Sequence, residues 1–106
     1  MTKRVLIDTD AKNEIDDQYA ILRALGAPEL KVEAITAAGY YDTNRKPRHT
    51  YIDGAERSYE EIVRVLDLMG MSGQMPVALG SSFPMTDKHT PKPSAAAELI
   101  IERHWM

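Results

Sequence analysis

The sequence predicts an α/β fold, with a parallel sheet and alternating helices in a Rossmann-like arrangement. Two observations predict it. Short apolar and β-branched runs alternate with helical patterns, in the order strand, helix, strand, helix, strand, helix. The first run also has a continuous apolar centre, which is typical of a parallel strand buried on both faces. Parallel strands joined through helices take right-handed crossovers, so we expect one sheet with helices packed on it.

The first strand is expected over residues 3–9, around an apolar run at residues 5–7. The first helix is expected over residues 15–25, where the apolar positions suit a helical face. Gly26 and Pro28 follow it, which is the usual order of residues at a helix C-terminus.

The second strand is expected over residues 30–38, which contain the β-branched residues Val32, Ile35 and Thr36. Residues 39–53 are polar and aperiodic, and we interpret them as a long loop. Long irregular loops in compact domains are usually functional or disordered.

The clearest helical pattern covers residues 54–69, followed by a short strand at 76–80, a loop at 81–93 and a last helix at 95–105. Ser94 is expected to cap that last helix. The helix at 54–69 is predicted to face the core with one apolar stripe. Its members are Tyr59, Ile62, Val63, Leu66 and Met69.

Composition limits the possible classes of protein. The 106 residues are 43% hydrophobic and 27% charged, which is typical of one ordinary globular domain over residues 1–106. The absence of cysteine excludes disulfides, thiolate zinc sites and a cysteine nucleophile. A net charge of −3 argues against non-specific binding to nucleic acid. No run is long enough for a membrane span or a secretory signal, so we expect a cytoplasmic protein with no membrane partner.

Acidic residues concentrate where the first predicted strand ends. Five of the sixteen acids fall within ten residues, opposed there only by Lys12. The five are Asp8, Asp10, Glu14, Asp16 and Asp17. Ligands of open parallel sheets bind beyond the carboxyl ends of the strands, and carboxylates are the hard oxygen ligands that Ca²⁺ or Mg²⁺ requires. The cluster therefore indicates a metal site.

Other interpretations of the cluster remain open. Asp16 could cap the helix while Asp17 complements its dipole, which accounts for one or two acids. A metal-dependent phosphohydrolase of haloacid-dehalogenase type would use Asp8 as the nucleophile of its D-x-D motif. A non-catalytic α/β module would hold a structural cation. An EF-hand fits poorly, because Asn13 stands where its loop needs glycine.

Three segments carry a family resemblance. Residues 5–20 (VLIDTDAKNEIDDQYA) resemble the inosine-uridine-preferring nucleoside hydrolase family, whose members open with a strand, D-x-D, a turn, D-D and a helix. Residues 28–36 (PELKVEAIT) are similar to the family's second strand. Residues 56–62 (ERSYEEI) look like a helix of the branch with the longer N-E-I-D-D motif.

The resemblance implies a calcium-dependent hydrolase that cleaves the N-glycosidic bond of a ribonucleoside, in purine or pyrimidine salvage. It implies that Asp10 and Asp17 coordinate Ca²⁺, with Asp10 also the general base. Asp16 would accept hydrogen bonds from ribose hydroxyls, and Asp8 would orient the calcium ligands. Asn44 would contact the base or the ribose.

The resemblance also implies that residues 1–106 are the N-terminal part of a longer nucleoside-hydrolase fold. Members of the family draw further calcium and ribose ligands from later strands. We therefore expect a C-terminal segment or a partner chain to complete the site, and a homo-oligomer is a further expectation.

Overall fold

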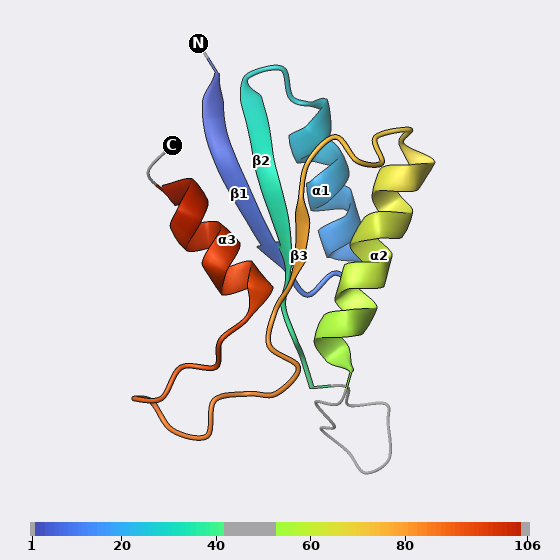
Figure 1. The fold of residues 1–106 in the computed structure, drawn as a ribbon. Coiled ribbons are helices and arrows are strands. Elements are labelled where there is room, and N and C mark those ends of the chain that lie inside the picture. The colour runs from blue at the N-terminus through green and yellow to red at the C-terminus, as the bar shows by residue number, and fades with distance from the viewer. Residues whose placement is uncertain (1, 42–52, 105–106) are drawn as a thin grey trace.

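The computed structural model describes residues 2–41 and 53–104. They form a three-stranded parallel sheet with helices between the strands, which confirms the predicted α/β class (Figure 1). The elements in chain order are β1 (Lys3–Thr9), α1 (Asp16–Gly26), β2 (Leu30–Ala37), α2 (Gly54–Leu68), β3 (Val77–Leu79) and α3 (Ala95–His104).

The strands lie in the order β1-β2-β3, so β2 is central. The backbone joins the strand ends on both sides of β2: Ala38 N donates to Thr9 O at 2.8 Å, and Gly80 N donates to Ala37 O at 2.8 Å. The polypeptide that leaves each strand therefore starts from the same edge of the sheet.

The β1–β2 register shifts between Val5 and Leu6, where β2 contains one extra residue, Glu33. This bulge lets Val32 and Ile35, three positions apart, both pack into the same core. The extra residue Glu33 points instead towards the helix on the other face of the sheet.

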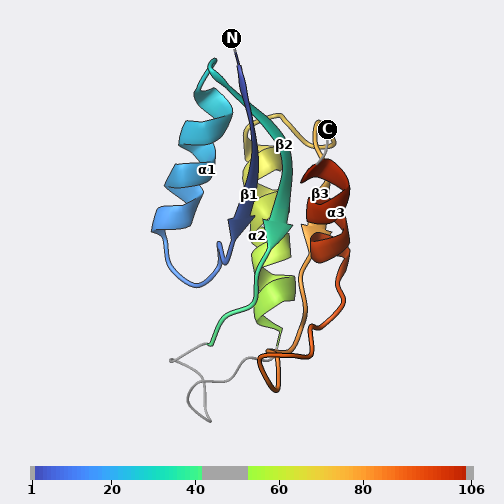
Figure 2. The same cartoon turned by 90° about the vertical axis from the view of Figure 1, so that its left-hand side faces the viewer.

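The helices cover both faces of the sheet, with α1 and α3 on opposite sides of it (Figure 2). Helices α1 and α2 share one core with β2, built around Ile21, Ile35 and Ile62, none more than 1% exposed. Helix α3 contacts β3 and β2.

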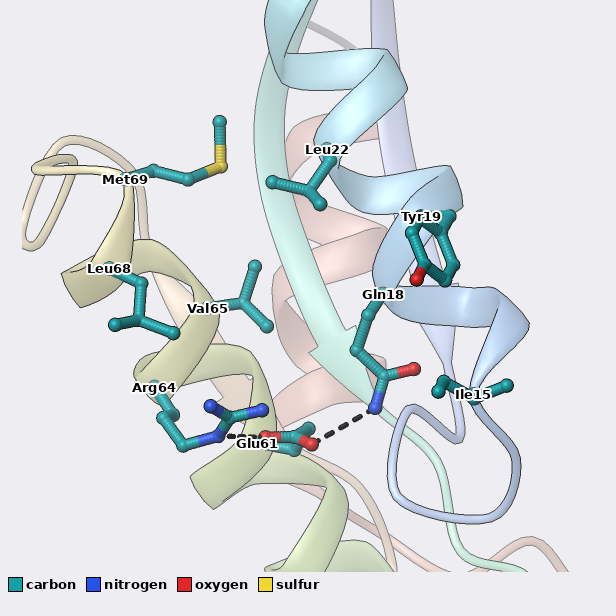
Figure 3. Close-up of a pocket in the computed structure, with 9 residues that line it drawn as sticks. All are labelled: Ile15, Gln18, Tyr19, Leu22, Glu61, Arg64, Val65, Leu68 and Met69. Carbon is teal, nitrogen blue, oxygen red and sulfur yellow. Dashed lines mark hydrogen bonds and ion pairs between the residues drawn. The ribbon is translucent and has the colours of Figure 1, made fainter.

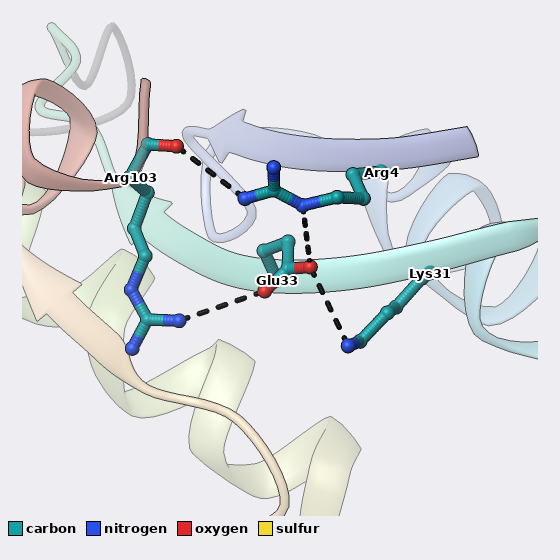
Figure 4. A network of polar contacts seen from close by, with 4 residues as sticks. All are labelled: Arg4, Lys31, Glu33 and Arg103. Atoms are coloured by element: carbon teal, nitrogen blue, oxygen red, sulfur yellow. Dashed lines mark hydrogen bonds and ion pairs between the residues drawn. The ribbon is translucent and has the colours of Figure 1, made fainter. Parts of the chain in front are cut away.

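A cluster of charges around Glu33 fastens α3 to the first two strands (Figure 4). Arg4 Nε donates to Glu33 Oε1 at 2.8 Å, and Lys31 Nζ lies 3.7 Å from the same oxygen. Arg103 Nη1 lies 3.5 Å from Glu33 Oε2. The hydrogen bond from Arg4, with the charges of all three cations, lowers the pKa of Glu33 despite the opposing effect of burial.

The predicted elements are all present, and their ends differ from the predicted ones by at most one residue. Ser94 Oγ accepts a hydrogen bond from Ala97 N at 3.1 Å, which confirms the predicted cap of α3. No helix in the described part of the chain is long and apolar enough to cross a membrane.

The apolar stripe predicted for α2 is partly wrong. Ile62 and Leu66 are buried, but Tyr59 and Val63 are exposed by 36% and 41%. The buried face is rotated towards α1 and includes Glu61, because polar partners on α1 and α2 compensate that carboxylate.

Gly80 lies against the end of β2, so a substitution at this residue tests how closely the backbones approach at the carboxyl edge of the sheet. A Cβ at residue 80 would lie 2.3 Å from Ala37 O. We expect Gly80→Ala to lower the free energy of unfolding by about 1–3 kcal/mol, since backbone must shift. Gly26→Ala is the control, because its Cβ meets nothing within 4 Å. Equal effects in urea unfolding would contradict the close approach.

Candidate functional site

The acidic cluster occupies the turn between β1 and α1, at the carboxyl edge of the sheet. The turn is closed by Asn13 N, which donates to Asp10 O at 2.8 Å. Ala11 is fully buried in the core shared by α1 and α2. The longer turn is therefore anchored at its second residue, and the polar residues around Ala11 stay at the surface.

Asp10 is partly buried and is held within the turn. Asn13 Nδ2 donates to Asp10 Oδ2 at 3.1 Å. One carboxylate oxygen is thus oriented by a neutral amide, which leaves Oδ1 for another ligand.

Asp17 is fixed to the end of β1 rather than to its own helix. The hydroxyl of Thr9, which is 5% exposed, donates to Asp17 Oδ2 at 2.5 Å. The side chain of Thr9 therefore points towards α1, and its bond sets the position of the first turn of that helix.

Asp8 lies on the opposite face of the sheet from Asp17. Successive side chains of a strand alternate between faces. Ile7 packs against the core of α1 and α2, and Thr9 bonds to α1, so Asp8 points to the face that carries α3. There the buried hydroxyl of Thr36 donates to Asp8 Oδ1 at 2.7 Å.

The remaining predicted residues have different outcomes. Asp16 is exposed in the first turn of α1. The N-cap of α1 is Ile15, with no side-chain cap bond, so the alternative in which Asp16 caps the helix is wrong. Asn44 lies outside the described residues.

No group of three or more His, Asp or Glu side chains in residues 2–41 and 53–104 is placed to hold a metal ion. The carboxylate oxygens at the turn are nonetheless the kind of ligand that a hard cation prefers. Asp10 and Asp17 each keep one carboxylate oxygen outside the hydrogen bonds described above. Calcium takes six to eight oxygens, so this pair would supply a minority of them.

A second acidic position, Glu61 on α2, is not apparent from the sequence. It is 5% exposed and lies at one end of a hollow of about 490 Å³ between α1 and α2 (Figure 3). Gln18 Nε2 donates to Glu61 Oε2 at 2.9 Å, and Arg64 Nε donates to Oε1. Lys12, from the acidic turn, places its Nζ 3.9 Å from Oε2.

These partners give Glu61 a structural role. The hydrogen bond from Arg64 is the main cause that lowers the pKa of Glu61, helped by Gln18 and by the charges of Arg64 and Lys12. Burial acts in the opposite direction. Because Lys12 belongs to the turn and Gln18 to α1, Glu61 connects both to α2. The only sequence signal for it is an acid within the helical face that packs on α1.

Comparison of the chain with protein families, with curated proteins and with solved structures finds no match. A functional proposal therefore depends on the chemistry of the chain's own residues.

Glu61→Gln tests the connection between the turn and α2. A carboxyl whose folded-state pKa is lowered stabilises the fold above its unfolded pKa, and this contribution is lost as the pH falls through the folded-state pKa. We expect the variant to be less stable by about 1 kcal/mol at pH 7, because charge-assisted bonds are lost. The difference should shrink at acidic pH in urea unfolding series. Glu60→Gln, an exposed neighbour on the same helix, is the control. A pH-independent difference would refute the role.

Proposed function

We propose that the protein is a calcium-dependent nucleoside N-ribohydrolase, or the part of one that carries its first calcium ligands. The observation that carries the proposal is the difference between the partners of the buried glutamates and those of the aspartates near the turn. Glu33 and Glu61 are each surrounded by cations. Within the described residues, Asp10 and Asp17 receive hydrogen bonds only from a neutral amide and a neutral hydroxyl.

This difference matters because a carboxylate paired with arginine or lysine has its charge compensated already. Asp10 and Asp17 instead keep their negative charge at the carboxyl edge of the sheet, where ligands of parallel α/β folds bind. Asp10, Glu14, Asp16 and Asp17 follow one another closely between the end of β1 and the first turn of α1, and a bound cation would relieve their mutual repulsion. The resemblance of residues 5–20 to the nucleoside hydrolase family supports calcium as that cation.

Asp10 and Asp17 would hold the calcium through their Oδ1 atoms, since Oδ2 of each is engaged. Water, the substrate and protein groups outside the described residues would provide the other ligands. When bound, calcium supplies positive charge that holds ribose hydroxyls and makes a neighbouring water more acidic.

The chain's own residues would then perform three tasks. Asp10 accepts a proton from the attacking water, with Asn13 holding its carboxylate in place. Asp16, exposed at the start of α1, accepts hydrogen bonds from ribose hydroxyls. The water oxygen bonds to C1′ while the N-glycosidic bond breaks, and the base leaves with the electron pair of that bond and takes up a proton.

Calcium titration tests the ligand assignment. We expect Asp10→Ala and Asp17→Ala each to weaken calcium binding at least about tenfold, because affinity follows the number of charged ligands. Glu14→Ala removes an exposed acid of the same turn and should leave the affinity unchanged. Calorimetry on the folded chain measures all three. Unchanged affinity in both aspartate variants would refute the assignment.

Ribose release tests the reaction. With inosine or uridine and calcium, we expect reducing sugar to appear and EDTA to abolish it. Asp16→Ala should raise KM more than it lowers kcat if its role is to hold the sugar. A folded, calcium-loaded protein that releases no ribose would refute the activity. A phosphorylated aspartate trapped on the chain and lost in Asp8→Asn would indicate the phosphohydrolase instead. Calcium that raises the melting temperature without any turnover would indicate a structural cation.

A further inference from the structure

Thr9, the last residue of β1, is fixed by the central strand. Its carbonyl oxygen accepts a hydrogen bond from Ala38 N at 2.8 Å, and its register partner on β2 is Ala37. The residue is 5% exposed, and its side chain lies on the face of the sheet that carries α1 and α2. Figure 2 shows the turn that follows, from the end of β1 to the start of α1. The sheet therefore sets the position of Thr9 independently of that turn.

The hydroxyl of Thr9 directs its single proton at Asp17. Oγ1 lies 2.5 Å from Asp17 Oδ2, and because an ionised carboxylate only accepts hydrogen bonds, the hydroxyl is the donor. A hydrogen bond to an ionised group is charge-assisted and stronger than a bond between neutral groups. Since Thr9 is buried, water competes poorly with Asp17 for this proton.

The donor that holds Asp10 is of a different kind. Asn13 is exposed and belongs to the same turn as Asp10, only three residues further along the chain. Any displacement of the turn would therefore carry both groups with it. Thr9 belongs to the sheet and Asp17 to α1, so their bond joins two separate elements. Of the two proposed calcium ligands, Asp17 is the one that the sheet itself holds.

The start of α1 depends on this bond because the helix has no side-chain cap. Its N-cap residue is Ile15, which contributes no side-chain hydrogen bond. Asp17 and Gln18, in the first turn, bond instead to other elements: Asp17 to Thr9 of β1, and Gln18 to Glu61 of α2. The direction of the Asp17 carboxylate is thus set by a contact with β1.

A hydroxyl orients a carboxylate without compensating its charge. Glu61 is held by Arg64 and faces Lys12, so its negative charge is already balanced within the chain. Thr9 provides a directed donor and no positive charge, so Asp17 keeps its attraction for a cation. Hydrogen-bonded partners of this kind stand behind the ligands of many metal sites, where they orient the ligand.

We propose that Thr9 is a positioning residue: its hydroxyl fixes the Asp17 carboxylate and so prepares Asp17 Oδ1 for the cation before the cation binds. The inference rests on the proposed function, because it names the residue that prepares one of the two calcium ligands. A ligand that is already fixed loses little further side-chain freedom when the ion binds. Thr9 contacts neither the calcium nor the substrate in this role, and acts only through Asp17.

Calcium titration of the whole chain by calorimetry tests the role of the hydroxyl. Thr9→Val keeps the shape of the side chain and removes the donor, and we expect it to weaken calcium binding at least about tenfold. Thr9→Ser keeps the donor and removes the methyl group, and should bind calcium nearly as tightly as the unmodified chain. An affinity that Thr9→Val leaves unchanged overturns the proposal. So does a loss in Thr9→Ser as large as that in Thr9→Val, because packing and not the hydroxyl would then be responsible.

Thr90→Val is the matched control. Thr90 Oγ1 also donates to an aspartate Oδ2, that of Asp87, at 3.1 Å, in the exposed loop after β3. The variant removes the same hydroxyl from the same kind of pair outside the acidic turn, so the calcium affinity should not change. A weakening equal to that of Thr9→Val overturns the assignment to Asp17.

The rotamer of Asp17 in the calcium-free protein provides a measurement that is independent of calcium. Three-bond couplings between its backbone and side chain should show one fixed χ1 rotamer, which calcium leaves unchanged. In Thr9→Val the couplings should become averaged, and in Thr9→Ser they should not. An Asp17 that samples several rotamers in the unmodified, calcium-free protein overturns the role of Thr9. An Asp17 that is fixed in a protein that binds no calcium overturns the proposed function instead.

Discussion

The burial of β2 is the constraint on which the rest of the structure depends. The segment from Ala34 to Ala37 is buried, with neighbouring strands on both sides and helices on both faces. Burial of this kind requires every backbone group to be paired. The end of β2 meets that requirement through Thr9 on one side and Gly80 on the other. The carboxyl ends of all three strands are thereby fixed at one edge, where the acidic turn begins.

The acids of the chain divide according to their partners. Glu33 and Glu61 are largely buried, and a buried charge is tolerated only where it is paired. Each of them joins separate elements: Glu33 joins α3 to β1 and β2, and Glu61 joins the turn and α1 to α2. The aspartates of the turn have better access to water and neutral partners. Among residues 2–41 and 53–104, the hydrogen-bond partners of Asp10 and Asp17 are neutral, and that property suits these two carboxylates to bind a cation.

Much of the fold could be predicted from local patterns, because strands and helices alternate along the sequence and each apolar run has a clear period. The face that α2 buries could not, because hydrophobicity alone ranks Val63 above Glu61. The burial of Glu61 depends on Gln18 and Arg64, and only the tertiary structure brings Gln18 to it. The clustering of acids could be predicted, because these residues are close together in the sequence. The hydrogen bond from Thr9 to Asp17 could not be predicted. It depends on how the turn returns α1 to the sheet.

Residue parity along β1 determines which side chains of this strand reach the acidic turn. Odd-numbered residues direct their backbone to β2 and their side chains to α1 and α2, as Ile7 and Thr9 show. Even-numbered residues direct their backbone away from β2 and their side chains to the face of α3, where Asp8 meets Thr36. A slip of one residue would exchange both sets. The backbone bonds at Lys3 and Thr9 fix that parity, and they thereby place the hydroxyl of Thr9 on the face of α1, where it donates to Asp17.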